Sequence, residues 1–360
     1  MENLSYAKQR IMDTASSFKK LYYIYKEGDS GSAFGEQMLE TAMILEDILS
    51  NDKDIEVVGR EDYYKIRKIL KKNDIYLDSV KINRSSGNRI QVVVKAKTLK
   101  KHYVPVMDMA EFLSGYFKKN LVPSTYARKY ISGTLAEYVL EESPEFFTMT
   151  GVRALSKNYA DISGDAYSCI NNQEGKSMVC ICDGMGTGAD AAKTSTAVVD
   201  MLEHFFEVGF SERTSVNMVN AAMATRGEES PFTLDLGVFD LYVGKYSMLK
   251  FGSMASYIKR RNGVEVVRPS SLPAGLLENA KPDMGEYSLG EGEYVIMVSD
   301  GVVDALPFYD KENQMAKIVG ELPFANPNLM ADKLMEEVFF YLGDKYKDDM
   351  TVIVTGIWKH

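Results

Sequence analysis

Cysteine and histidine are scarce in this sequence, with three of each among 360 residues. Three cysteines give no disulfide framework, which is typical of proteins from a reducing compartment. Cys180 and Cys182 lie two positions apart in an apolar run, so both are expected to be buried on one side of a strand. The few histidines provide no ligand set for a zinc centre. No cysteine has an arginine six positions after it, as a thiolate-based phosphate site needs.

Long apolar runs are also missing. None approaches the ~20 residues that a membrane-spanning helix requires. The first residues, Met1 to Ser5, lack the basic and then apolar order of a signal peptide. A cytoplasmic location is therefore predicted for the chain. The net charge of −9 argues against nucleic acid as a partner, because binding to a phosphate backbone requires clustered Lys and Arg.

The length of 360 residues predicts more than one domain. Residues 1–55 are predicted to form a helical regulatory or dimerisation segment. Apolar residues recur there at spacings of three and four, and Gly28 to Ser32 interrupts them. The two stripes are Leu4, Ala7, Ile11, Ala15, Phe18, Tyr22 and Tyr25, then Met38, Ala42, Leu45 and Leu49. A helical hairpin packed on its own domain is the alternative. The length of the first stripe favours a dimer or signalling helix.

Residues 56–145 predict a small α+β regulatory domain. Helices are expected over Glu61–Lys72 and Met107–Phe117, and strands over Ile75–Ile82 and Arg89–Ala96, with further strands to Glu142. The segment Ser85 to Asn88 is typical of a turn between the first two strands. No acidic cluster or glycine-rich loop in this region suggests a chemical role. The boundary to the next domain is expected at Ser143 to Glu145.

Residues 146–360 predict packed antiparallel sheets flanked by helices, because many short strands are separated by hairpin-length links. Strands are expected over Phe147–Ala154, Asp165–Ile170, Met178–Cys182, Leu234–Leu241, Tyr246–Phe251, Ser256–Arg260, Val264–Arg268, Tyr294–Val298 and Thr351–Ile357. Helices are expected over Ala189–Glu207, Glu212–Thr225 and Leu329–Leu342. Asn326 as cap and Pro327 in the first turn mark the start of the last helix.

Four short segments of this region bring an acidic residue to a strand end or loop. They are Ser163-Gly164-Asp165, Asp183-Gly184-Met185-Gly186, Ser299-Asp300-Gly301 and Asp348-Asp349-Met350-Thr351. A single Asp-Gly pair is weak evidence, because that dipeptide is common in turns. Acids that emerge together at the ends of adjacent strands can share Mg²⁺ or Mn²⁺, which prefer oxygen ligands. Two such ions can activate water for an in-line attack on phosphorus.

In order and spacing, the four segments resemble the metal-dependent serine/threonine protein phosphatases of the PPM family, also called type 2C. Within that family, Asp183 to Gly188, Leu234-Asp235-Leu236 and Val298 to Val302 are similar to the stage II sporulation protein E group. The resemblance extends from about Thr148 to Gly356. It implies a PPM-type α-β-β-α sandwich of two antiparallel sheets, preceded here by the helical segment and the small α+β regulatory domain.

The resemblance also implies the site. Asp165 and Asp183 match the catalytic acids that bridge two Mn²⁺ or Mg²⁺ ions, and the Gly184 carbonyl matches a further metal ligand. Asp300 and Asp348 match the remaining acids. Asp349 stands where the family usually has Asn. It is either a group behind the ligands or one that exchanges roles with Asp348.

A function in sporulation follows from the same resemblance. The implied substrate is the phosphoserine form of an anti-sigma-factor antagonist, whose dephosphorylation activates a sporulation sigma factor. A homodimer and contact with a cell-division protein are implied. Members of the group are anchored at the division septum by N-terminal membrane spans, which this sequence does not contain. The helical pair over residues 189–225 is implied to be a switch that completes the metal site.

Two departures from the family pattern leave roles unassigned. Met185 stands where better-known members have a His that can protonate the leaving group. Those members also have an Arg ahead of the first acid that binds the phosphate. Here Arg153 and Lys157 lie upstream, but neither has the matching spacing. The sequence therefore gives neither the general acid nor the phosphate-binding residue.

Two other interpretations of the region are available. Residues Gly184 to Ala189 fit the G-x-G-x-x-A pattern of a dinucleotide fold, but Asp183 would repel a pyrophosphate and a second helix follows where a strand is needed. A non-enzymatic alternative is a catalytically weak PPM-fold scaffold or sensor that acts by binding partners. Retention of every acid argues against it.

Overall fold

The protein is described here from a computed structural model, which covers residues 2–27, 33–50, 55–85, 89–100, 102–124, 127–157, 162–172, 175–186, 188–224, 231–277, 280–342 and 348–360. The chain divides into two compact units. The N-terminal unit comprises Met1–Phe18 and Ala42–Pro144, and the C-terminal unit comprises Lys19–Thr41 and Glu145–His360. Among the described helices, none has a stretch long and apolar enough to span a membrane.

Two helices begin the chain, α1 (Glu2–Glu27) and α2 (Ala33–Ser50), as the apolar stripes predict. The expected break at residues 28–32 lies outside the described part of the chain. In the C-terminal unit, Glu40 of α2 accepts a hydrogen bond from the Ser211 amide through Oε1, at 3.0 Å. Ser211 directly precedes α6 (Glu212–Ala224), so a carboxylate lies at the positive end of that helix.

The α+β part of the N-terminal unit is one antiparallel sheet with two helices on it. Its strand order is β1-β2-β3-β7-β5. The strands are β1 (Ile55–Val57), β2 (Ile75–Ser85), β3 (Arg89–Thr98), β5 (Leu121–Pro123) and β7 (Ala136–Glu142), with a separate pair β4 (Val104–Pro105) and β6 (Tyr130–Ile131). The helices are α3 (Arg60–Lys72) and α4 (Val106–Phe117).

Strand β3 shows why this sheet forms, because every second side chain is buried along its length. The buried set includes Ile90, Val92 and Val94, which share one cluster with Leu70 of α3 and Leu113 of α4. Alternation of period two places one face against the helices. The predicted helices and first two strands are confirmed. The predicted turn at residues 85–88 falls largely on residues that the structure does not describe.

Two five-stranded antiparallel sheets form the centre of the C-terminal unit, with orders β15-β12-β11-β10-β9 and β14-β13-β16-β17-β8. The first sheet contains β9 (Asp165–Asn171), β10 (Lys176–Gly184), β11 (Phe232–Asp240), β12 (Lys245–Phe251) and β15 (Asp283–Ser288). The second contains β8 (Phe146–Leu155), β13 (Ser256–Arg260), β14 (Gly263–Val267), β16 (Glu293–Val298) and β17 (Met350–Lys359).

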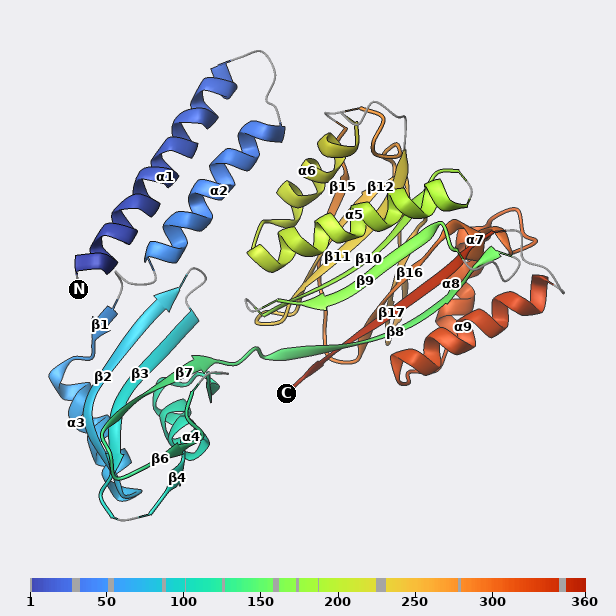
Figure 1. Ribbon diagram of the computed structural model, residues 1–360. Coiled ribbons are helices and arrows are strands. Elements are labelled where there is room, and N and C mark those ends of the chain that lie inside the picture. Colours follow the sequence, from blue (N-terminus) through green and yellow to red (C-terminus); the bar gives the residue numbers. More distant parts are fainter. Residues whose placement is uncertain are drawn as a thin grey trace. The chain divides into compact units, whose positions relative to one another are not determined.

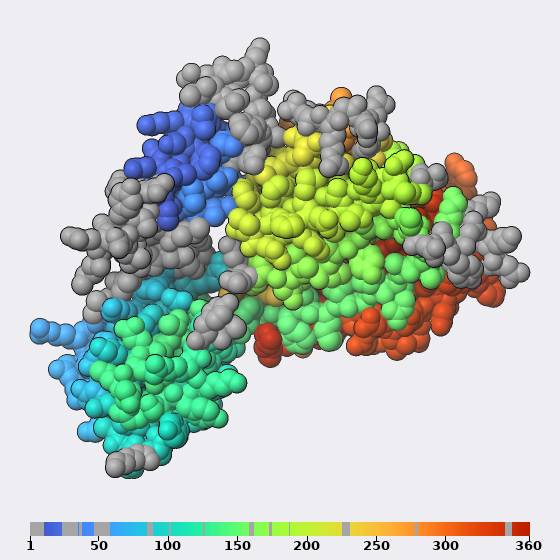
Figure 2. Space-filling model, in the orientation of Figure 1, coloured from blue at the N-terminus to red at the C-terminus, as the bar shows by residue number. Residues whose placement is uncertain are grey.

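Helices cover the outer faces of both sheets (Figure 1). Helices α5 (Ala189–Val208) and α6 lie on the first sheet, and their outer surface is the yellow-green part of the face in Figure 2. Helices α8 (Lys311–Glu321) and α9 (Pro327–Leu342) lie on the second sheet. The order of layers is therefore α-β-β-α, which confirms the predicted sandwich.

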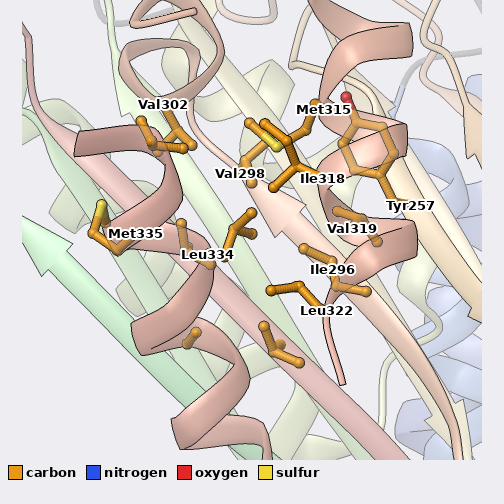
Figure 3. Close-up of a cluster of buried hydrophobic side chains, with 14 of the residues drawn as sticks. Tyr257, Ile296, Val298, Val302, Met315, Ile318, Val319, Leu322, Leu334 and Met335 are labelled. Carbon is orange, nitrogen blue, oxygen red and sulfur yellow. The ribbon is translucent and has the colours of Figure 1, made fainter. Parts of the chain in front are cut away.

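Strand β10 is buried on both faces. Met178, Cys180 and Cys182 join the cluster under α5 and α6, whereas Val179 and Ile181 face the second sheet. The expected burial of both cysteines on one side is thus confirmed. Under the other helical layer, Met315 and Ile318 of α8 and Leu334 of α9 pack over Ile296 of β16 (Figure 3).

The sequence did not predict three elements of this unit, namely strand β15 and helices α7 (Asp300–Asp304) and α8. Strand β15 lies at the sheet edge and alternates half-buried with exposed residues, so it has no apolar run. Helix α7 has a single turn's length and begins at one of the candidate ligands. Helix α9 begins as predicted, since the Asn326 side chain accepts the Asn328 amide at 2.9 Å.

A buried ion pair connects the two sheets. Lys250 of β12 is 0% exposed, and its ammonium donates to Oδ2 of Asp235 on β11 at 2.5 Å. It also donates to the Met254 carbonyl at 2.9 Å and to the Ser256 hydroxyl, on β13 of the second sheet, at 2.7 Å. The Ser256 hydroxyl in turn donates to the Asp235 carboxylate. The ammonium is therefore fully hydrogen-bonded inside the protein.

Candidate metal centre and active site

A cavity of about 510 Å³ opens where the acid-bearing segments meet, at one end of the two sheets. Its lining includes Asp183, Gly184, Asp300, Asp348 and Asp349. Asp183 lies at the end of β10, Asp300 begins α7 directly after β16, and the two final acids precede β17. The structure thus brings together residues that are far apart in the sequence.

Asp165 lies beside this group at the start of β9. It is the direct cross-strand partner of Asp183 in the antiparallel pair β9–β10. Its Oδ2 accepts a hydrogen bond from the Thr351 hydroxyl of β17 at 2.6 Å. Asp165 is not among the residues that line the cavity described above, but its pairing with Asp183 places it next to the site.

The pKa values of these carboxyl groups show how strongly they interact. Burial raises the pKa of Asp183 to about 8, with further contributions from the charges of Asp165 and Asp300. Burial also raises the pKa of Asp165 to about 6, against the hydrogen bond from Thr351. The pKa of Asp300 is raised by burial and by Asp348. Crowded, half-buried carboxylates are unfavourable unless cations or protons balance them.

The donor set fits hard divalent cations. All side-chain donors are carboxylate oxygens, which Mg²⁺ and Mn²⁺ prefer, and the raised pKa values indicate a site in need of positive charge. Among the described residues, no three His, Cys, Asp or Glu side chains are arranged to enclose an ion by themselves. Mg²⁺ typically takes one or two carboxylates and keeps several waters. A site with carboxylate donors that does not enclose the ion is therefore compatible with this cation.

Ser299 and Thr351 hold the acid-bearing segments together. The Thr351 amide donates to the Ser299 hydroxyl at 2.8 Å, and the Ser299 amide donates to the Thr351 carbonyl at 2.9 Å. Both residues are buried. Because Thr351 also binds Asp165, the segments of β9, β16 and β17 are fixed to one another behind the cavity. The sequence analysis did not single out this pair.

Asp349 has a different environment from the other acids. Its Oδ1 accepts the Lys157 amide and its Oδ2 accepts the Gly164 amide, both at 2.6 Å. Of the two roles left open for Asp349, this geometry favours a group that positions the backbone. Asp348 then remains the acid of this segment that is available for a cation.

The glycines of the Asp-Gly pairs are required by close packing of the backbone. A Cβ atom on Gly184 would lie 2.3 Å from the Ala191 carbonyl oxygen of α5. A Cβ atom on Gly301 would lie 2.0 Å from the Asp349 carbonyl oxygen. Both distances are far below van der Waals contact, so any larger residue would displace a segment that bears an acid.

The structure also locates the residues at which the sequence departs from the family pattern. Met185 lines the cavity with 51% of its surface exposed. Arg153 is directed away from the acids, since its guanidinium pairs with Asp332 of α9. Lys157, by contrast, lines the cavity. A smaller neighbouring cavity of about 170 Å³, which the sequence did not predict, is lined by Asp235 among other residues.

A family model described as stage II sporulation protein E (SpoIIE) matches residues 173–357, which is more than half of the chain. The chain belongs to the SpoIIE family. The SpoIIE protein of Priestia megaterium is 34% identical over 210 residues, which cover 58% of this chain and 36% of that relative. The chain thus spans about a third of the length of this curated SpoIIE protein.

Two solved structures of a SpoIIE protein share the fold of this chain. The PP2C phosphatase domain with a fragment of the regulatory domain of SpoIIE from Bacillus subtilis aligns with a TM-score of 0.66 and 25% identity, over 90% of this chain and 95% of that one. The same phosphatase domain, in a crystal form without domain swapping, gives 0.51 and 31% over 61% and 96%. The C-terminal unit therefore has the fold of the PP2C phosphatase domain of SpoIIE.

Proposed function

We propose that this SpoIIE-family protein is a metal-dependent phosphatase that hydrolyses phosphoserine in a protein substrate. The observation that carries the proposal is the meeting of Asp183, Asp300 and Asp348 in one cavity of a PP2C-type domain, with Asp165 beside them. Water and phosphoserine give serine and inorganic phosphate, so the reaction needs neither a redox partner nor a covalent enzyme intermediate.

Asp165, Asp183, Asp300, Asp348 and the Gly184 carbonyl would hold two Mn²⁺ or Mg²⁺ ions. Bound there, the ions would supply an activated water and stabilise the charge that develops on the phosphoryl oxygens. Thr351 keeps one oxygen of Asp165 in a fixed direction. Met185 has no proton to donate, so we assign protonation of the leaving serine oxygen to water.

Family membership supports a finer proposal for the substrate. We infer that it is the phosphoserine form of an anti-sigma-factor antagonist, and that its dephosphorylation leads to activation of a sporulation sigma factor. The described cysteines are all free, which supports a reducing, cytoplasmic site of action. A homodimer, contact with a cell-division protein and action at the division septum stay predictions.

The test is hydrolysis by the full chain of p-nitrophenyl phosphate and of a phosphoserine-bearing antagonist protein. We expect turnover with Mn²⁺ and none in excess chelator. The variant Asp300→Asn should be inactive. The matched control Asp304→Asn changes an exposed acid on the same helix, outside the cavity, and should keep turnover. Undiminished hydrolysis in chelator would refute the metal-dependent mechanism. Metal binding without turnover on either substrate would favour a scaffold that acts by binding.

A further inference from the structure

One basic residue is found among the described residues that line the acidic cavity. This residue is Lys157, which follows the end of β8. The other polar groups on the walls are mainly carboxylates, including those of Asp183, Asp300 and Asp348. A cavity of this kind repels a phosphorylated substrate unless positive charge compensates for the acids.

Cations at the acids would not supply all of the charge that is needed. Four carboxylates and two divalent ions compensate one another, whereas a phosphoserine carries a charge of about −1.5 to −2 at neutral pH. A further cation on the wall is therefore favourable for substrate binding. The Lys ammonium is well suited, since it is a compact point charge with three donors that binds phosphate in many proteins.

The position of Lys157 is fixed by its backbone. Its amide donates to Oδ1 of Asp349, and the Gly164 amide donates to Oδ2 of the same carboxylate. One side chain thus binds the backbone at both Lys157 and Gly164. The adjacent strands β8 and β17 also pair directly, with Leu155 opposite Met350. Lys157 therefore keeps its position relative to Asp348, the neighbour of Asp349.

The other upstream cation has a different function. The Arg153 guanidinium binds Asp332 through two nitrogens, with Nη2 to Oδ2 at 2.7 Å, and its Nη1 donates to the Val152 carbonyl at 2.6 Å. The two bonds to Asp332 attach β8 to α9. Arg153 is not among the residues that line the cavity.

We propose that Lys157 binds the phosphoryl group of the substrate, and that Asp349 is the positioning residue that holds Lys157 at the cavity wall. This inference rests on the proposed phosphatase function and assigns the phosphate-binding group that the sequence left open. It also gives Asp349 a function other than that of a metal ligand.

The experiment measures two properties of the full chain separately. Binding of inorganic phosphate to the Mn²⁺-loaded protein is followed by titration calorimetry, and binding of Mn²⁺ alone by electron paramagnetic resonance. We expect Lys157→Met to weaken phosphate binding about tenfold or more, as loss of a charged hydrogen bond implies, without changing Mn²⁺ affinity. Lys157→Arg should restore most of the phosphate affinity. The matched control Arg153→Met should bind phosphate like the wild type.

Asp349→Ala tests the second half of the inference. It removes the acceptor for both amides, so phosphate binding should weaken, by up to as much as in Lys157→Met. The inference about Lys157 is overturned if Lys157→Met binds phosphate like the wild type, or if it loses Mn²⁺ by the same factor. The inference about Asp349 is overturned if Asp349→Ala binds phosphate normally. Both results are independent of turnover, so absence of hydrolysis in the wild type would overturn the phosphatase proposal alone.

Discussion

Replacement of Lys250 by methionine is predicted to cost much of the stability of the C-terminal unit. Lys250 is 0% exposed and the side chain of Asp235 is 3% exposed, so both charges are almost completely removed from bulk solvent in the folded state. Burial lowers the pKa of Lys250 from 10.5, while the charge and hydrogen bond of Asp235 oppose this shift. Removal of the ammonium leaves the Asp235 carboxylate buried with only the Ser256 hydroxyl as a described donor.

The magnitude follows from this imbalance. Removing one partner of a buried pair costs roughly 3–5 kcal/mol, because an uncompensated charge remains. Domains of this size have a free energy of unfolding of only about 5–15 kcal/mol. The double variant Lys250→Met with Asp235→Leu removes both charges, so it should recover most of the loss. Lys245→Met on the same strand removes only an exposed pair with Glu286 and should cost at most about 1 kcal/mol.

The assay is urea denaturation followed by tryptophan fluorescence. The single tryptophan, Trp358, lies in β17 and reports on the C-terminal unit alone. A loss below about 1 kcal/mol in Lys250→Met would refute the reasoning, because it would mean that the carboxylate is hydrated or protonated at little cost. A double variant no more stable than Lys250→Met would show that the lost packing, and not the unpaired charge, accounts for the effect.

Three further outcomes are expected from the site and its surroundings. Asp183→Asn should abolish turnover yet raise the melting temperature of the metal-free protein, since it relieves the burial of a charge and the repulsion by nearby acids that together raise the pKa of Asp183. A lower melting temperature in chelator would contradict this. Thr351→Val should weaken Mn²⁺ binding about tenfold or more, because it loses the hydrogen bond to Asp165. Thr351→Ser should restore Mn²⁺ binding. Equal Mn²⁺ affinities of Thr351→Val and the wild type would refute the role of the hydroxyl. If the helical pair α5 and α6 is a switch, deletion of residues 1–145 should change Mn²⁺ affinity and turnover. Glu40→Ala should change both in the same direction. Unchanged Mn²⁺ affinity and turnover in both variants would exclude control through α2.

The secondary structure could be predicted where burial follows a simple period. Alternation along β3 and the continuous apolar run of β10 are visible in the sequence, and each was assigned correctly. Strand β15 escaped because an edge strand with one half-buried face has no apolar run. Helix α7 escaped because Val302 and Val303 disfavour a helix locally, and burial against the second sheet determines its conformation.

The candidate site was predicted as a set of acids but not as an arrangement. The order and spacing of the four acid-bearing segments, compared with the family pattern, indicated which acids to expect at the site. The partners of Asp349 could not be named, since Lys157 and Gly164 lie 192 and 185 positions away and contribute only backbone amides. The same holds for Thr351 and Asp165, whose hydrogen bond joins residues 186 positions apart. Contacts of this kind leave no local pattern in one sequence.

The place of β17 in its sheet has a consequence for biosynthesis. This strand is the last of the C-terminal unit to be made, yet it lies between β16 and β8 and supplies Thr351 to Asp165. In a nascent chain that still lacks β17, strand β8 is therefore separated from β14, β13 and β16, and Asp165 lacks the hydrogen bond from Thr351. Domains fold as units during translation, so the catalytic unit can mature only after β17 leaves the ribosome. An unfinished polypeptide therefore lacks the assembled set of acids that the complete unit brings together.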